Sequence, residues 1–162
     1  MRTAISLVVL LVGLAGTLAG QRPTDIVKWS ADAPAAGVRP GTVARIGLTA
    51  RVENGWKLYA LVQPKGGPIP LGIAVAKEAP FTLMPKDIVA PKAKAQQDEL
   101  FGGGNTQYYE ETASFVLPVA VAKTVAPGEH TVPIDVTFQA CGKDLCLRPF
   151  TQRLDVKISV VK

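Results

Sequence analysis

The sequence of 162 residues predicts an all-β fold, an immunoglobulin-like antiparallel β-sandwich of about eight strands. Several segments alternate apolar and polar residues with a period of two, which is typical of strands that bury one face. Clusters of glycine, proline and asparagine separate these segments, and no long amphipathic helix pattern follows residue 20. A chain of this length is suited to one domain with one core.

The alternation is clearest in four segments, and four shorter segments follow it less strictly. In the first of them, Ile46 and Leu48 alternate with Arg45 and Thr49, so one face of the strand is expected to be buried. We expect residues 90–99, rich in alanine, lysine and glutamine, to form a long loop. The clear strands are 45–52, 113–121, 131–138 and 154–160, and the shorter ones are 26–30, 56–61, 72–76 and 82–84.

Turn residues lie between the expected strands. Asn54-Gly55 is the strongest hairpin signal, because both residues tolerate the positive φ that tight hairpin turns require. Other turns are expected at Arg39-Pro40-Gly41, at 102–105 and at Pro127-Gly128. Residues 102–104 are all glycine but lead into strand-like residues, so they are not a phosphate-binding loop before a helix.

The N-terminal segment has the features of a secretion signal. Arg2 precedes an uncharged stretch whose centre, residues 7–12, is entirely apolar, and small residues around Ala19 suit a signal peptidase. We therefore expect residues 1–19 to be a signal peptide and residues 20–162 to be one periplasmic or otherwise extracytoplasmic domain that is not inserted in the membrane. A membrane anchor is the alternative, although glycine and threonine interrupt the apolar stretch.

Charge and composition exclude several functions. The 18 Lys and Arg residues are interleaved with 13 Asp and Glu residues and form no basic run, so no nucleic-acid partner is expected. His130 is the one histidine in the chain, which leaves a hydrolytic triad without an assembly. A copper site is a weak alternative, because soft thiolates favour Cu(I) but His130 and Met84 are the remaining candidate ligands.

The two cysteines, Cys141 and Cys146, are the most informative feature. In an oxidising compartment such a close pair is expected to form a disulfide, and the opposed positions of a hairpin are near enough to bridge. Alternation along 131–138 turns Phe138 toward the core. The same parity predicts that Gln139 and Cys141 face outward and that the Cys141 sulfur is reachable.

Local reasoning leaves two roles open for this pair. A loop of about six residues gains only about 2 kcal/mol from closure, against about 4.7 kcal/mol for a loop of about 100 residues. The disulfide is thus either a modest hairpin staple or a reactive pair. The staple interpretation describes a secreted β-sandwich interaction module whose end loops bind a protein or a sugar.

Several short motifs, in order, resemble the N-terminal periplasmic domain of the thiol:disulfide interchange protein DsbD, a group also called disulfide bond corrector proteins. The resemblance extends over essentially the whole mature chain. Two differences stand out: the spacing is Cys-x4-Cys, and Leu100 replaces an aromatic residue of the family. The matching motifs are Phe138-Gln139-Ala140-Cys141 with Cys146-Leu147-Arg148-Pro149, Gly55-Trp56-Lys57-Leu58-Tyr59, Gly66-Gly67-Pro68-Ile69-Pro70 and Asp98-Glu99-Leu100-Phe101-Gly102.

The resemblance implies roles for individual residues. Cys141 and Cys146 would be the exchanging pair, and Asp98 and Glu99 match acidic positions near the cysteines. Leu100 and Phe101 match a cap that shields the disulfide, and Tyr59 matches an aromatic position in its surroundings. From local sequence alone, we would expect Asp98 and Glu99 to be solvated in a loop and Tyr59 to lie in the core.

The resemblance also implies partners. The domain would accept electrons from a membrane-embedded thiol reductant on a separate chain, because the sequence lacks both a membrane electron-transfer segment and a thioredoxin-like domain. It would pass these electrons to periplasmic thioredoxin-like or disulfide-isomerase proteins. This electron transfer is linked to cytochrome c maturation. No cofactor or metal is expected. Any enzymatic activity would be that of a protein disulfide reductase component.

Overall fold

The computed structural model describes residues 21–77 and 79–162, so the expected signal peptide lies outside the described residues. Within this part of the chain there are eleven strands and three short helices, which confirms the all-β class. The strands are β1 (Val27–Asp32), β2 (Val43–Val52), β3 (Lys57–Tyr59), β4 (Gly72–Val75), β5 (Phe81–Leu83), β6 (Lys94–Asp98), β7 (Gly104–Tyr109), β8 (Thr112–Val121), β9 (Gly128–Phe138), β10 (Ala140–Cys141) and β11 (Phe150–Val160). The helices are α1 (Pro23–Ile26), η1 (Pro85–Asp87) and η2 (Glu99–Phe101).

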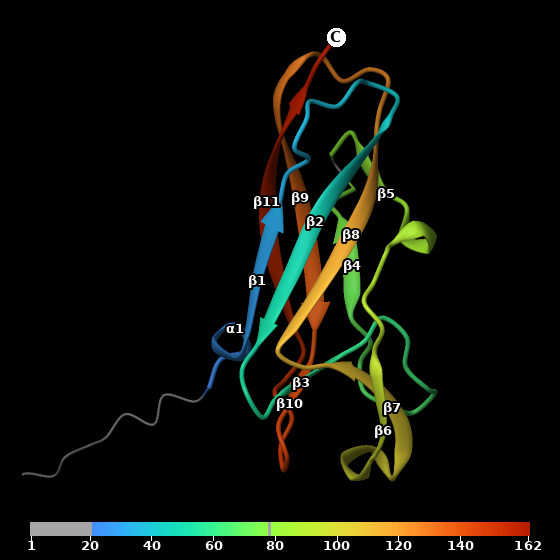
Figure 1. The fold of residues 1–162 in the computed structure, drawn as a ribbon, viewed down its shortest axis with the longest axis vertical. Coiled ribbons are helices and arrows are strands. Elements are labelled where there is room, and N and C mark those ends of the chain that lie inside the picture. Colours follow the sequence, from blue (N-terminus) through green and yellow to red (C-terminus); the bar gives the residue numbers. More distant parts are fainter. Residues whose placement is uncertain (1–20, 78) are drawn as a thin grey trace, which may run out of the picture.

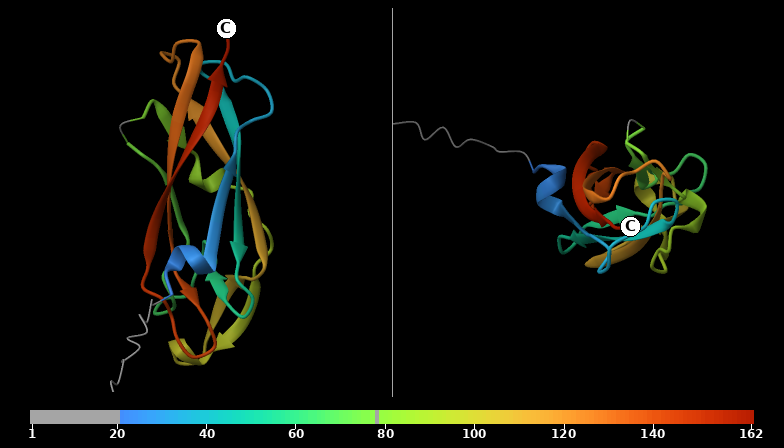
Figure 2. Two further views of the ribbon diagram at one scale, coloured as in Figure 1. Left: turned by 90° about the vertical axis from the view of Figure 1, so that its left-hand side faces the viewer. Right: turned by 90° about the horizontal axis from the view of Figure 1, so that it is seen from above.

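The strands form three antiparallel sheets. The β2 sheet has the order β1-β2-β8-β5, the β9 sheet has the order β11-β9-β4, and the cysteine sheet has the order β10-β3-β7-β6. The β2 sheet lies in front of the β9 sheet in Figure 1, and together they make the sandwich. The cysteine sheet lies at the end of the molecule opposite the C-terminus (Figures 1 and 2).

Alternation in the long strands builds the core between the β2 and β9 sheets. Burial along β2 and β8 alternates almost residue by residue, as the sequence predicted, because successive side chains of a strand point to opposite faces. Trp29 of β1 extends this core, and its ring centroid lies 6.3 Å from that of Phe115 and 5.8 Å from that of Phe138. Fully buried members from three strands include Ile46, Leu48, Leu117, Val119, Ile134 and Val136.

The prediction of a hairpin at Asn54-Gly55 is wrong. A turn does form there, with the Trp56 amide donating to the Glu53 carbonyl at 3.1 Å and Gly55 at φ +80°. However, β2 pairs with β1 and β8, whereas β3 pairs with β7 and β10. Asn54 is not among the described residues of positive φ, so the turn is not the type that joins adjacent antiparallel strands. It passes the chain from one sheet to another.

The expected loop at residues 90–99 is also wrong, because β6 occupies Lys94–Asp98 and pairs with β7. This strand lies at the edge of the cysteine sheet, and only its last residue is buried. Because neither face of this strand is covered along most of its length, polar side chains occur on both faces. The sequence consequently shows no period-two alternation there. β6, β7 and the two-residue β10 account for the excess over about eight strands.

The chain changes sheets at Gln139. β9 pairs with β11 as far as Phe138, and β10 then pairs with β3 through Ala140 and Cys141. The Tyr59 amide donates to the carbonyl of Gln139 at 3.4 Å at the changeover. This change carries the cysteines out of the sandwich and into the cysteine sheet.

Candidate thiol-disulfide site

Cys141 and Cys146 form a disulfide with their Cα atoms 4.0 Å apart. Cys141 ends β10, and Cys146 opposes it in an isolated antiparallel bridge. The Gly142 amide donates to the Leu145 carbonyl at 2.9 Å, and the Leu147 amide donates to the Ala140 carbonyl at 2.9 Å. The two cysteines therefore face each other across a tight backbone turn.

The prediction that Cys141 faces outward is wrong, because the side chain has no solvent exposure. Parity along β9 holds through Phe138, but the change of sheet at Gln139 resets which face is buried. Ala140 and Cys141 are consequently both buried. Cys146 is only partly buried, so it is the more exposed residue of the pair.

Aromatic side chains surround the disulfide. Tyr59 and Tyr108 form a buried cluster with Cys141 that is separate from the sandwich core, and Phe101 and Cys146 pack against it. The rings of Tyr59 and Phe101 meet edge to face, with centroids 5.5 Å apart. This arrangement places the disulfide in an apolar shell of its own.

The carboxylate of Asp98 accepts hydrogen bonds from residues of this shell and of the segments beside it. One carboxylate oxygen accepts from the Tyr59 hydroxyl at 2.9 Å and from the Thr106 hydroxyl at 3.3 Å. The other accepts from the Leu100 amide at 3.2 Å. Asp98 is only 5% exposed and Thr106 is fully buried, so these bonds satisfy the buried carboxylate. Burial, and secondly the hydrogen bond to Asp98, raise the pKa of the Tyr59 hydroxyl well above its usual range.

The segment predicted to be the cap includes the short helix η2, Glu99–Phe101, which begins directly after Asp98. It ends at Gly102, whose φ of +66° is a left-handed conformation that glycine adopts without strain. Phe101 turns inward against Tyr59, whereas Glu99 is exposed and Leu100 is 42% exposed. Of the residues predicted for the site, Tyr59, Asp98 and Phe101 therefore join the disulfide cluster, and Glu99 and Leu100 lie on its outer surface.

Sequence reasoning missed Tyr108, Thr106 and Trp56. The first two lie two residues apart on β7 and are both buried, a period-two pattern that was available in residues 104–109. Trp56 lies under the cysteine turn, since a Cβ atom added to Gly142 would lie 3.7 Å from its ring. These three residues support the site from one strand of the cysteine sheet, β7, and from the turn that precedes another, β3.

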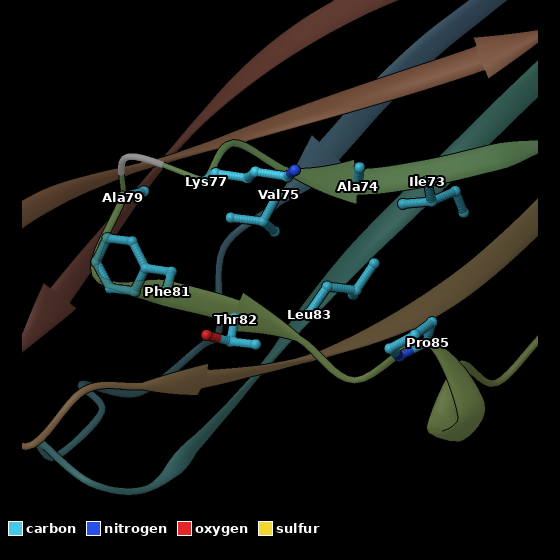
Figure 3. A pocket seen from close by; sticks show the side chains of 9 residues that line it. All are labelled: Ile73, Ala74, Val75, Lys77, Ala79, Phe81, Thr82, Leu83 and Pro85. Atoms are coloured by element: carbon cyan, nitrogen blue, oxygen red, sulfur yellow. The ribbon is translucent and has the colours of Figure 1, made fainter.

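Two of the hollows on the surface of the described residues have volumes of about 400 Å³, and the disulfide lines neither of them. A depression of about 430 Å³ separates the cap from the cysteine turn, with Lys57, Glu99, Leu100 and Lys143 among its lining residues. A more apolar hollow of about 400 Å³ lies between β4 and β5, where Phe81 and Leu83 face Ile73 and Val75 (Figure 3). The first hollow adjoins the cap, so it is the one that belongs to the site.

In residues 21–77 and 79–162, no group of three or more histidine, cysteine, aspartate or glutamate side chains is placed to hold a metal ion. His130 lies near the start of β9, where its ring contacts the carbonyl of Ala126 at 2.7 Å. The same described residues contain no helix long and apolar enough to cross a membrane.

The fold and the site define a class of protein: an immunoglobulin-like β-sandwich that carries a cysteine pair in a separate sheet at one end. Comparison with protein families agrees with this class. Residues 26–158 match the family described as the N-terminal part of the thiol:disulfide interchange protein DsbD, and the chain belongs to that family. The resemblance seen in the sequence motifs is confirmed.

A solved periplasmic domain shares the fold. The N-terminal periplasmic domain of ScsB from Proteus mirabilis superposes with a TM-score of 0.56 at 17% identity, covering 86% of this chain and 49% of that one. The chain thus spans about half the length of that structure. AggA, the major subunit of aggregative adherence fimbriae type I from Escherichia coli, gives a TM-score of 0.43 at 15% identity, covering 83% of this chain and 94% of that one. Comparison with curated protein sequences gives no match.

Proposed function

We propose that this chain is a periplasmic thiol-disulfide interchange domain that relays electrons through Cys141 and Cys146. In this proposal a membrane-embedded thiol reductant on a separate chain reduces the disulfide. The resulting dithiol then reduces periplasmic thioredoxin-like or disulfide-isomerase proteins, including those that serve cytochrome c maturation. Residues 1–19 act as the secretion signal and residues 20–162 form the single exported domain.

The observation that carries this proposal is the location of the disulfide. Cys141 packs with Tyr59 and Tyr108 in a cluster separate from the sandwich core, so reduction leaves that core intact. A disulfide whose main purpose is stability would more usefully join distant segments, because closure of a short loop gains only about 2 kcal/mol. The pair is therefore placed for exchange without unfolding.

The exchange transfers two electrons. A partner thiolate attacks one sulfur of the Cys141–Cys146 disulfide, which breaks the S–S bond, forms a mixed disulfide and releases the other cysteine as a thiolate. The second partner thiolate then attacks the partner's own sulfur in the mixed disulfide, which closes the partner's disulfide and releases the remaining cysteine. Two electrons and two protons then reside on the two cysteines until the reverse sequence delivers them to the client. Cys146 is the site of attack, because its side chain is only partly buried whereas that of Cys141 is fully buried.

The surrounding residues control access and reactivity. We expect Phe101, which packs against the disulfide cluster, and the exposed Leu100 beside it to move when a partner docks, which is a gating step. The carboxylates of Asp98 and Glu99 would oppose a negatively charged thiolate nearby by repulsion between like charges. Tyr59 joins the two effects, because its ring packs on Phe101 and its hydroxyl donates to Asp98.

The test is a redox titration of the domain in glutathione and dithiothreitol buffers, with thiol trapping and circular dichroism on the same samples. We expect a midpoint above about −300 mV, where exchangeable disulfides lie, and an unchanged fold in both states. A disulfide that resists reduction until the domain unfolds would contradict the relay. That result would leave a stapled β-sandwich interaction module.

A further inference from the structure

Gln139 makes two side-chain hydrogen bonds at the point where the chain leaves the sandwich for the cysteine sheet. Its amide nitrogen donates to the carbonyl of Leu147 at 3.3 Å, on the segment that returns from Cys146. Its amide oxygen accepts from the backbone amide of Ile69 at 3.2 Å, on the loop between β3 and β4. One side chain therefore connects the entry to the cysteine turn, the exit from it and a neighbouring loop.

The loop at the far end of this connection is the Gly66-Gly67-Pro68-Ile69-Pro70 motif. Proline has no backbone N–H and holds its φ near −65°, so Ile69 supplies the one amide donor among residues 68–70. That donor is the group that Gln139 accepts from. Pro68 is buried, and the Leu71 amide donates to the Ala60 carbonyl at 3.1 Å. Residues 68–70 thus hold one backbone donor beside the segments that flank the cysteines.

We propose that Gln139 is a positioning residue that keeps the two segments flanking the cysteines aligned after reduction and thereby sets the reduction potential of the pair. This inference rests on the exchange function proposed above. A glutamine amide suits the position because one side chain must donate to Leu147 and accept from Ile69. A carboxylate or an aliphatic side chain lacks at least one of these capacities.

The effect on the equilibrium has a definite sign. In the oxidised protein the covalent bond itself holds Cys141 opposite Cys146, so losing the Gln139 connection releases little motion at the turn. In the reduced protein the backbone bonds of the turn and Gln139 hold the thiols together. Removing Gln139 therefore gives the reduced state extra freedom, lowers the effective concentration of one thiol toward the other and makes the disulfide easier to reduce.

Gln63 offers a matched control on the same loop. Its amide nitrogen donates to the carbonyls of Ala60 and Gln107, and its amide oxygen accepts from the Gln107 amide at 3.1 Å. It is partly buried, as Gln139 is. However, Gln63 connects the loop to β7 and makes none of these bonds to the cysteine turn. Its removal disturbs a comparable set of hydrogen bonds without touching the segments that flank the cysteines.

The experiment compares Gln139→Met with Gln63→Met and with the unaltered domain. Each protein is equilibrated with glutathione: oxidised glutathione gains two electrons and two protons and yields two thiols, while the Cys141 and Cys146 dithiol becomes the disulfide. We expect the equilibrium constant for disulfide formation to fall about tenfold in Gln139→Met, which is about 30 mV for a two-electron couple. In Gln63→Met it is expected to change less than about twofold, although both variants lose thermal stability.

Equal potentials in Gln139→Met and the unaltered domain, with both proteins folded, would overturn the inference. So would an equal shift in Gln63→Met, which would indicate a general loosening of the loop. Should Gln139→Met not fold, Gln139→Glu retains the acceptor for Ile69 and loses the donor to Leu147, and its potential must also shift upward. Failure of the unaltered domain to exchange while folded would count against the proposed function instead, so the two failures are distinguishable.

Discussion

The sandwich and the cysteine sheet are stabilised by different means. Between the β2 and β9 sheets, aliphatic and aromatic side chains such as Leu117 and Ile134 fill the core with no exposure. In the cysteine sheet the strands are shorter, and the buried residues include the carboxylate of Asp98 and the hydroxyl of Thr106. Apolar packing stabilises the first region, and a small aromatic cluster with a hydrogen-bonded network stabilises the second.

This difference separates stability from chemistry. Large apolar cores contribute most of the free energy of folding, and that of the sandwich does not include the cysteines. Under the proposed function, this separation lets the cysteine sheet change oxidation state at a limited cost in stability. The following substitutions test that separation, beginning with the largest expected effect.

Cys141→Ser should abolish exchange completely while the sandwich stays folded. The disulfide closes a short loop, so its loss should reduce the free energy of unfolding by no more than about 2 kcal/mol. Thiol trapping with a thioredoxin-like disulfide substrate measures exchange, and chemical denaturation measures stability. Unfolding of the variant at ambient temperature would show that the two regions depend on each other.

Leu117→Ala should have the opposite profile. The side chain has no exposure, and emptying a buried leucine position lowers the free energy of unfolding by about 2–5 kcal/mol. The reduction potential of the folded fraction should remain that of the unaltered domain. A clear shift in the reduction potential of the folded protein, alongside the loss of unfolding free energy, would contradict the separation of the two regions.

Asp98→Ala should loosen the cap without unfolding the sandwich. It leaves the Tyr59 and Thr106 hydroxyls and the Leu100 amide without their acceptor, which should lower the free energy of unfolding by about 1–3 kcal/mol. The neighbouring Glu99→Ala is the control, because Glu99 is exposed and its loss should stay within about 0.5 kcal/mol. Urea denaturation measures both variants. An equal loss of unfolding free energy in Asp98→Ala and Glu99→Ala would mean that the buried hydrogen bonds of Asp98 contribute nothing to stability.

Tyr59→Phe should lower stability at neutral pH and change its pH dependence only in the alkaline range. The folded state raises the pKa of this hydroxyl above its ordinary value of 10.0, so folding favours the neutral form. The stabilisation is complete below the ordinary pKa and is lost as pH rises through the folded one. In urea denaturation, the difference between the unaltered domain and the variant should be constant below about pH 9 and should shrink at higher pH. A gap that widens there would contradict the assigned direction.

The sequence predicted well where physical periodicity was simple. Residues of β2, β8 and β9 bury one face against a continuous core, so a period of two describes them fully. β6 escaped because an edge strand with polar side chains on both faces has no such period. The turn at Asn54-Gly55 was recognised, but its local chemistry does not say which sheet receives the next strand.

The site followed the same rule. The pairing of Cys141 with Cys146 was predictable because the two lie five positions apart on a hairpin. The burial of Cys141 was not, because parity cannot be carried past a residue at which the chain changes sheets. The burial of Asp98 likewise depends on Tyr59 and Thr106, which are distant in sequence or lie on an unrecognised strand.

The short pairing of β10 with β3 has a consequence for how such domains can diverge. Only Ala140 and Cys141 are paired in that ladder, and the chain rejoins the sandwich at Phe150. Residues 142–149 lie outside the strand pairings of the sandwich. Insertions, deletions and substitutions among them therefore leave the registers of the sandwich strands unchanged. The spacing and the flanking residues of the cysteines can therefore diverge while the sandwich scaffold is kept.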